Sequence, residues 1–287
     1  MRQYDSSMVS QPTFLANVDL HKAQQVVKWI VYTLLIINFG YYLVEDMTRA
    51  IHTLTPDSTL LDWTAEFATS IDEAAWFILL ALLELETYIL EDEDWEGWVA
   101  KLVHGIRLVC IVMIGHTVFA FSNTVIDYAP DVPVEGVADL CELAAQDVSF
   151  VYNLEYTEIT TDNCRSLSAA SAFFWMADDP VVSDVAGLEL ERDLAWADLA
   201  EVIIWLIILF AIEIVVRLQE KGVTGGTWIT SLNRLKTVLY LSLVGIGIYW
   251  ASLGHWLYLW DELVWIGGFM AIEMNISEWR DEILQED

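Results

Sequence analysis

The sequence predicts an all-α integral membrane protein with six transmembrane helices, arranged as three tandem two-helix hairpin repeats, with a partly structured extracytoplasmic insertion. Three observations predict this fold class: apolar runs long enough to cross a bilayer, basic residues gathered on one side of those runs, and a motif that recurs in alternate runs. The chain has 287 residues, of which 56% are hydrophobic. A span needs about 20 mostly apolar residues, and lipid offers the backbone no partner, so each run should form a helix.

Six apolar runs have the necessary length. The first is followed by no small-residue cleavage site, so we expect a retained helix and not a signal peptide. The third and fourth runs are separated by a connection too long for a plain turn, which should carry structure of its own. The expected helices cover residues 26–44, 74–90, 102–121, 199–216, 235–253 and 257–276. The chain is accordingly divided into a cytoplasmic N-terminal segment (1–25), helices one to three (26–121), a loop domain (122–196), helices four to six (197–276) and an acidic cytoplasmic tail (277–287).

Basic residues indicate which side of the membrane each connection occupies, because Lys and Arg are enriched in cytoplasmic loops. Ten of the 13 basic residues lie on one side of the predicted membrane. They are found before the first run, between the second and third runs, between the fourth and fifth runs, and after the sixth run. Only Arg49, Arg165 and Arg192 lie on the opposite side. We therefore expect an integral protein of the cell (cytoplasmic) membrane, with both termini in the cytoplasm and the loop 122–196 outside.

The outer loop holds two of the three cysteines, Cys141 and Cys164. In an oxidising compartment these two residues are expected to form a disulfide, which would be worth about 3 kcal/mol in the chain-entropy model. Within the same loop, residues 139–147 have the pattern of a short helix. Residues 148–159 are rich in β-branched and aromatic side chains, which favours extended structure.

The chain is strongly acidic: 43 Asp and Glu against 13 Lys and Arg give a formal net charge of −30. Binding to nucleic acid is disfavoured because it needs a basic surface. A solvated acidic surface, adapted to salt or to high pH, accounts for this charge, and the presence of only five Lys agrees with it. A vestibule that attracts cations is the alternative.

A motif of the form [D/E]-x3-W-x7-E occurs in each even-numbered run. Of the 14 tryptophans in the chain only three fit it. Such repetition suggests triplication of a helical hairpin, because two helices per unit restore the same orientation each time. The first acid and the last Glu of a copy are separated by about 18 Å along a helix axis. The three copies are Asp72–Trp76–Glu84, Glu201–Trp205–Glu213 and Asp261–Trp265–Glu273.

One interpretation of the motif is an ion-binding site. Acids within the hydrocarbon face protein or water and mark functional sites, and the last Glu of each copy falls there. Three converging glutamates would suit a hard cation such as Ca²⁺, Mg²⁺ or Mn²⁺, of unknown identity, or would pass protons or Na⁺. The first acid of each copy and a mid-span histidine would extend the ion path. The candidate ion-binding residues are Glu84, Glu213, Glu273, Asp72, Glu201, Asp261 and His116.

The other interpretation is structural, with each glutamate held in an ion pair near the cytoplasmic ends of the helices. Long basic side chains can reach along a helix to such partners. Buried ion pairs are better evidence for a fixed orientation than for stability. The expected pairs join Glu84 to Arg107, Glu213 to Arg217 or Lys236, and Glu273 to Lys28.

No motif typical of an enzyme is found: the sequence has no Gly-rich phosphate loop, HExxH, GxSxG or CxxC. We therefore expect a protein without catalytic activity and with no cofactor other than a possible cation. The first hypothesis is a cation or proton transporter or channel that uses the repeated intramembrane glutamates. The alternative is a membrane scaffold or a subunit of a larger membrane complex. The expected partners are the lipid bilayer and either a second copy of the chain or a larger complex.

Overall fold

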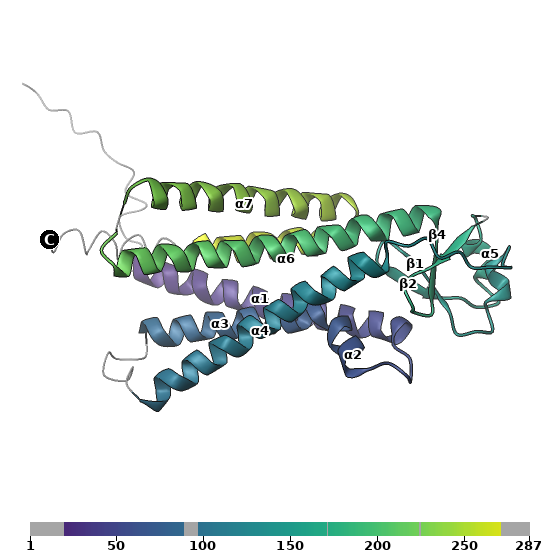
Figure 1. The fold of residues 1–287 in the computed structure, drawn as a ribbon, viewed down its shortest axis with the longest axis horizontal. Helices are drawn as coiled ribbons and strands as arrows, with labels where there is room; N and C mark the ends of the chain where they lie inside the picture. Colours follow the sequence, from purple (N-terminus) through teal and green to yellow (C-terminus); the bar gives the residue numbers. More distant parts are fainter. Residues whose placement is uncertain (1–19, 89–96, 171, 224, 271–287) are drawn as a thin grey trace, which may run out of the picture.

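The computed structural model describes residues 20–88, 97–170, 172–223 and 225–270, which form an elongated helical bundle with a small sheet at one end (Figure 1). The start of α1 and the turn between α6 and α7 lie at the end opposite to the sheet (Figure 1). The helices are α1 (Leu20–Thr53), α2 (Leu60–Glu66), α3 (Ala68–Tyr88), α4 (Trp98–Asp127), α5 (Cys164–Leu167), α6 (Val185–Glu220) and α7 (Thr227–Ser252), followed by a helical segment over residues 256–270. The strands are β1 (Ser149–Tyr152), β2 (Glu155–Glu158), β3 (Phe173–Trp175) and β4 (Val181–Asp184).

Four of the described helices are long and apolar enough to cross a membrane. The candidate spans are Trp29–Thr53 in α1, Trp98–Asp127 in α4, Val185–Leu218 in α6 and Thr227–Ser252 in α7. Helix α3 has 21 residues, but Asp72, Glu73, Glu84 and Glu86 interrupt its apolar sequence. The structure thus supports a mostly helical membrane protein, while the count of six spans and the hairpin repeat stay predictions.

The helices extend beyond the apolar runs that predicted them. Helix α1 continues past residue 44 to Thr53, and α4 continues past residue 121 to Asp127. Helix α6 begins at Val185, directly after β4 and before the expected start at 199. The ends of α1 and α6 contact strands of the sheet, as where Nδ1 of His52 lies 2.8 Å from Ser149 Oγ, so packing holds these turns helical although they are polar.

The core of the bundle forms where α4 packs against both α3 and α6, α6 packs against α7, and α1 packs against α3. All three motif tryptophans belong to this core, with side chains from 6% to 9% exposed. The core residues buried with them are Leu35, Ala75, Cys110, Ile114, Ile208, Leu243 and Ile266. Large aromatic side chains bury much apolar surface, so this cluster contributes strongly to the packing of α3 and α6.

The residues between α4 and α6 form a compact domain around a four-stranded sheet with the strand order β2-β1-β4-β3. Strands β1 and β2 form an antiparallel hairpin within the segment expected to be extended, and β1 pairs in parallel with β4. The segment expected to be a short helix holds only a 3-10 turn, Leu140–Glu142, because the Asp139 side chain accepts from the backbone of Cys141 and fixes a tight turn. The predicted pairing of Cys141 with Cys164 is confirmed, since the two cysteines lie at disulfide distance with their Cα atoms 4.8 Å apart.

The β1–β2 hairpin anchors this domain to the helices. Its tip residues Asn153 and Leu154 have φ angles of 56° and 61°, the left-handed backbone that a two-residue hairpin turn requires. The Asn153 amide donates to the backbone oxygen of Leu253 at 3.0 Å and lies 3.2 Å from Nε2 of His255. The backbone N–H of Leu154 donates to Glu191 at 3.0 Å. These contacts fix the hairpin tip against α6 and the turn that follows α7.

Candidate functional site

An acidic cavity of about 100 Å³ lies among the helices, at the end of the bundle that carries the sheet. The hairpin tip reaches it, because Leu154 is one of the lining residues. Arg49 is the one basic residue among the described residues that line the cavity. The acidic residues that line it are Glu45, Asp46, Asp72, Glu73, Asp198, Glu201, Asp261 and Glu262.

The α1 side of the cavity is a fully bonded polar network. Asp46 is 2% exposed and accepts from the backbone N–H and the hydroxyl of Ser70 at 3.0 and 2.7 Å. Arg49 donates to Asp46 at 3.3 Å and also to the carboxylate and the backbone oxygen of Glu66. Glu45 accepts from the Tyr258 hydroxyl at 2.6 Å. Arg49 is therefore occupied by partners at this end of the cavity, and the carboxylates there have donors.

The first acid of each motif copy faces the cavity and accepts from a neutral donor. Within α3, the indole N–H of Trp76 donates to Asp72 Oδ2 at 2.9 Å, because four residues separate them by one helical turn. Asn38 donates to Asp261 Oδ1 at 2.7 Å. Trp250 donates to Glu201 Oε2 at 3.3 Å. These contacts orient the three carboxyl groups without any described basic side chain beside them.

The neighbouring acids are less well satisfied. Glu73 is 7% exposed and Glu262 is 3% exposed, yet Oε2 of each is buried without a hydrogen-bond partner among the described residues. Oδ1 of Asp72 is also buried without a hydrogen-bond partner among the described residues. Trp205 donates to Glu262 Oε1 at 3.2 Å, and the carboxyl groups of Glu201 and Glu262 lie within hydrogen-bonding reach of each other. Two carboxylates this close repel each other, so the arrangement calls for a proton shared between them or a cation beside them.

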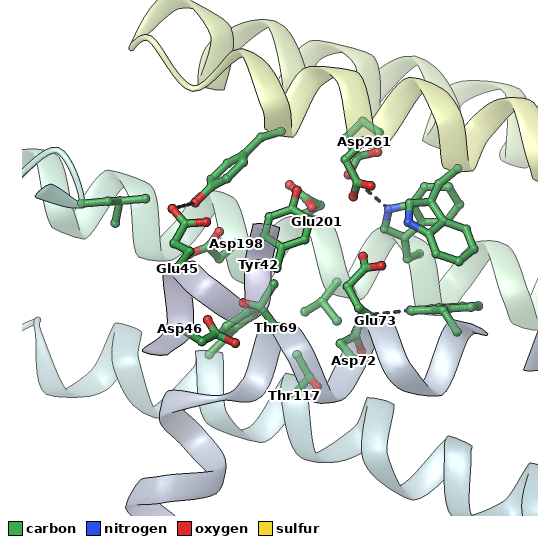
Figure 2. Close-up of a pocket in the computed structure, with 18 of the residues that line it drawn as sticks. Tyr42, Glu45, Asp46, Thr69, Asp72, Glu73, Thr117, Asp198, Glu201 and Asp261 are labelled. Carbon is green, nitrogen blue, oxygen red and sulfur yellow. Dashed lines mark hydrogen bonds between the residues drawn. The ribbon is translucent and has the colours of Figure 1, made fainter. Parts of the chain in front are cut away.

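Figure 2 shows Glu73 and Asp261 pointing toward each other across the space between their helices, with Glu201 beside them. On one side the motif tryptophans pack together: the ring centroids of Trp76 and Trp205, and of Trp76 and Trp265, are 6.3 Å apart. These three tryptophans also line the cavity. The carboxyl groups therefore meet a wall of large aromatic rings, which leaves little room for water beyond it.

The other predicted site residues lie elsewhere. Glu213 is exposed and accepts from Arg217 at 2.6 Å, one turn along α6. His116 does not line the cavity; its ring lies 6.3 Å from Phe119, and its Nε2 has no described partner. Arg107 and Lys236 both take part in interactions, and Lys236 is buried. The side chains of Glu84 and Lys28, and the whole of Glu273, lie outside the described residues.

Five cavity acids were not among the candidates from the sequence. A usable signal existed, since three pairs of adjacent acids occur near the ends of apolar runs, and each pair contributes both members to the cavity. Asp198 has the weaker signal of lying three residues before Glu201, on the same helical face. The missed residues are Glu45, Asp46, Glu73, Asp198 and Glu262.

A second acidic cluster lies outside the membrane helices, near α2. Burial raises the pKa of Asp179 to about 7, and the nearby carboxylates of Glu66, Asp178, Asp62 and Asp127 raise it further in the same direction. In the described residues, one group of three side chains, Asp139 with Cys141 and Cys164, brings its potential metal-ligand atoms within 4.8 Å of one another. Those two sulfurs are paired with each other, so that group has no free thiolate ligand.

No protein-family model, no curated protein and no solved structure matches this chain. The fold and the site define its class as a helical membrane protein with an acidic cavity inside the bundle. The function is therefore argued from the geometry of that cavity alone.

Proposed function

We propose that the protein is a cation or proton transporter or channel, and that the acidic cavity is the ion's binding place on its route through the membrane. One observation carries the proposal. Carboxyl groups more than nine-tenths buried converge from α3 and the 256–270 helix, with no described base beside Glu73 or Glu262. Ionisable groups inside membrane helices are costly and typically mark ion or proton pathways.

The contrast with the Arg49 network supports a functional role. A buried ion pair used for architecture satisfies its members, as Asp46 and Arg49 do through Ser70 and Glu66. Glu73 and Glu262 are also buried, but each keeps one oxygen without a partner in the part of the chain that the structure describes. Leaving a charged group in this state costs stability, so a sequence that served only packing would gain by replacing it with an apolar residue.

The proposed topology has six membrane helices in three hairpin units, both termini in the cytoplasm and the sheet domain outside. In this arrangement the cavity lies toward the outer face, and the motif tryptophans separate it from the cytoplasmic half. An ion on this route would pass the ring cluster of Trp76, Trp205 and Trp265. We therefore propose that the cluster is the inner barrier of the path.

The test is flux into liposomes that contain the purified full-length protein. Proton entry is followed with an enclosed pH-sensitive dye, and cation entry is followed with ion-selective dyes under an imposed membrane potential. The variants Glu73→Gln, Glu201→Gln and Glu262→Gln remove cavity charges one at a time. Glu213→Gln is the matched control, because Glu213 lies on the same helix as Glu201 but is exposed beside Arg217.

We expect flux in the wild type and in Glu213→Gln, and a loss of at least about tenfold in the cavity variants that elute as folded protein. Equal flux in all four variants would place the ion route elsewhere and overturn the proposal. If wild-type protein carries neither protons nor cations, the transporter interpretation fails, and a scaffold or subunit of a larger complex is the function that remains.

A further inference from the structure

We propose that the acidic cavity binds one hard divalent cation, of the Ca²⁺, Mn²⁺ or Mg²⁺ kind, between Glu201 and Glu262, with Glu73 and Asp261 beside them. This inference rests on the proposed function, because it concerns the same cavity, and it adds the class of ion that binds there. The starting observation is the hydrogen bonding of the carboxylates. Glu201, Asp261 and Glu262 are each held through one oxygen by a neutral donor, while Oε2 of Glu73 and of Glu262 has no partner among the described residues.

The pattern repeats across helices. Trp205 donates to Oε1 of Glu262, and Trp76 donates to Oδ2 of Asp72. The second oxygen of each carboxyl group, Oε2 and Oδ1, has no partner among the described residues. Carboxylates that ligate metal ions are typically oriented in this way by a hydrogen bond to the non-ligating atoms. The indole donors therefore leave Glu262 and Asp72 each with one oxygen available for an ion.

Protons would satisfy this arrangement only one pair at a time. The O–H of a protonated carboxyl group needs an acceptor, so each proton serves one carboxyl group and the one neighbour to which it donates. One proton shared between Glu201 and Glu262 would satisfy that pair only. The buried Oε2 of Glu73 would still lack a hydrogen-bond partner among the described residues. A dication is attracted to all of these oxygens at once and offsets two negative charges.

Basic side chains do not take this role among the described residues. Arg49 is the one base that lines the cavity, and it is held by Asp46 and Glu66. Its single positive charge is shared between those two carboxylates. Among the described lining residues no base is left for Glu73, Glu201, Asp261 and Glu262, and one dication would offset two of their charges.

The chemistry and size of the cavity select the class of ion. Its described lining offers oxygen atoms from carboxyl and hydroxyl groups, and contains no Cys and no His, which disfavours softer metals such as Zn²⁺ or Cu⁺. A water molecule takes about 30 Å³ of liquid. A cavity of about 100 Å³ therefore has room for one ion and a few waters. Ca²⁺ uses six to eight oxygens at flexible positions, which carboxylates with some water provide.

The surrounding tryptophans permit a direct test with Tb³⁺, a hard ion whose emission is sensitised by nearby indoles. Full-length protein in detergent is titrated with Tb³⁺ under excitation of tryptophan, at high NaCl so that exposed carboxylates are screened. Trp205 and Trp250 contact Glu262 and Glu201, so a bound ion lies close to both rings. Calorimetry with Ca²⁺ and with Mn²⁺ gives the number of sites independently.

We expect Tb³⁺ to bind at one saturable site, and to be displaced by Ca²⁺ or Mn²⁺ but not by K⁺ at the same concentration. Glu262→Gln should weaken it by at least about tenfold, and Glu213→Gln should leave it unchanged. Asn38→Leu, which removes only the amide that holds Asp261, should weaken it by about 10-fold or more. The Asn38 variant keeps all carboxylates, so it tests the site even if Glu262→Gln fails to fold.

The inference is overturned if wild-type protein has no saturable site. It is also overturned if Glu262→Gln and Asn38→Leu both bind the ion with the same affinity as the wild type. Proton or monovalent flux that depends on the cavity, without divalent binding, also overturns it but leaves the proposed function standing. Divalent binding without any flux has the opposite meaning: the site exists, and the transport proposal fails.

Discussion

Asp46 and Glu262 are buried to the same degree, 2% and 3% exposed, but their surroundings differ. Asp46 accepts two hydrogen bonds from Ser70 and one from Arg49. Glu262 accepts one long bond from Trp205 and faces the carboxyl group of Glu201. The same chemical change, from carboxylate to amide, should therefore have opposite effects on stability at the two positions.

Asp46→Asn should lower the free energy of unfolding by about 3 kcal/mol, because an amide would turn an N–H₂ group toward the donors of Ser70 or Arg49 and would remove one of the two carboxylates that Arg49 contacts. Glu262→Gln should raise it by about 1–2 kcal/mol when divalent ions are chelated, because the new amide can donate to Glu201. Unfolding in detergent at alkaline pH, followed by tryptophan fluorescence, measures both changes. Destabilisation of similar size in the two variants would refute the reasoning.

Three further predictions concern the sheet domain. Replacing Cys141 and Cys164 by Ser removes a cross-link between residues 23 apart, and should lower the unfolding free energy of that domain by about 3 kcal/mol, measured by chemical denaturation. Asn153→Ala removes the contacts to Leu253 and His255 and should speed amide hydrogen exchange in the β1–β2 hairpin by about tenfold. An unchanged exchange rate would mean that other contacts hold the domain against the helices. Folding raises the pKa of Asp179 from 3.8 to about 7, so between these pH values the folded state binds one proton more than the unfolded state. Stability should therefore fall as pH rises from about 4 to about 7 and then level off. Asp179→Asn should remove this slope from thermal-unfolding midpoints measured across pH.

Hydrophobicity predicted the four described helices that are apolar enough to span a membrane, among six expected, and the motif led to three acids that line the cavity. Asp72, Glu201 and Asp261 lie there because each is at the start of a span-like run and four residues before a buried tryptophan. The last glutamate of the motif can be compared in one copy only, and there Glu213 does not line the cavity. Twelve residues correspond to about three and one-third turns, so the last Glu lies about 120° around the helix from the first acid. Glu213 accordingly lies at the surface beside Arg217.

The remaining cavity residues depend on which helices are neighbours, and an apolar run does not specify its neighbours. Glu45 belongs to α1, which carries no copy of the motif, and it enters the cavity because α1 packs against α3. Asn38 is separated from Asp261 by 223 positions in the chain, so only the folded structure shows that the two side chains meet. The hairpin tip at Leu154 was predicted as extended structure, but its contact with the cavity depends on how the sheet domain docks.

The adjacent acid pairs explain how one helix can supply both a fixed and an available carboxylate. Neighbouring residues are separated by about 100° around a helix, so the two acids of a pair reach different partners. Asp261 accepts from an amide while Glu262 keeps one oxygen without a described partner; in the other pair Asp72 accepts from an indole, and Asp72 and Glu73 each keep one such oxygen. In α6 the second position is Val202, so that helix offers one acid at this level and not two. An ion bound here would therefore meet an asymmetric ring of carboxylates, and substitutions at equivalent motif positions should differ in their effect on binding.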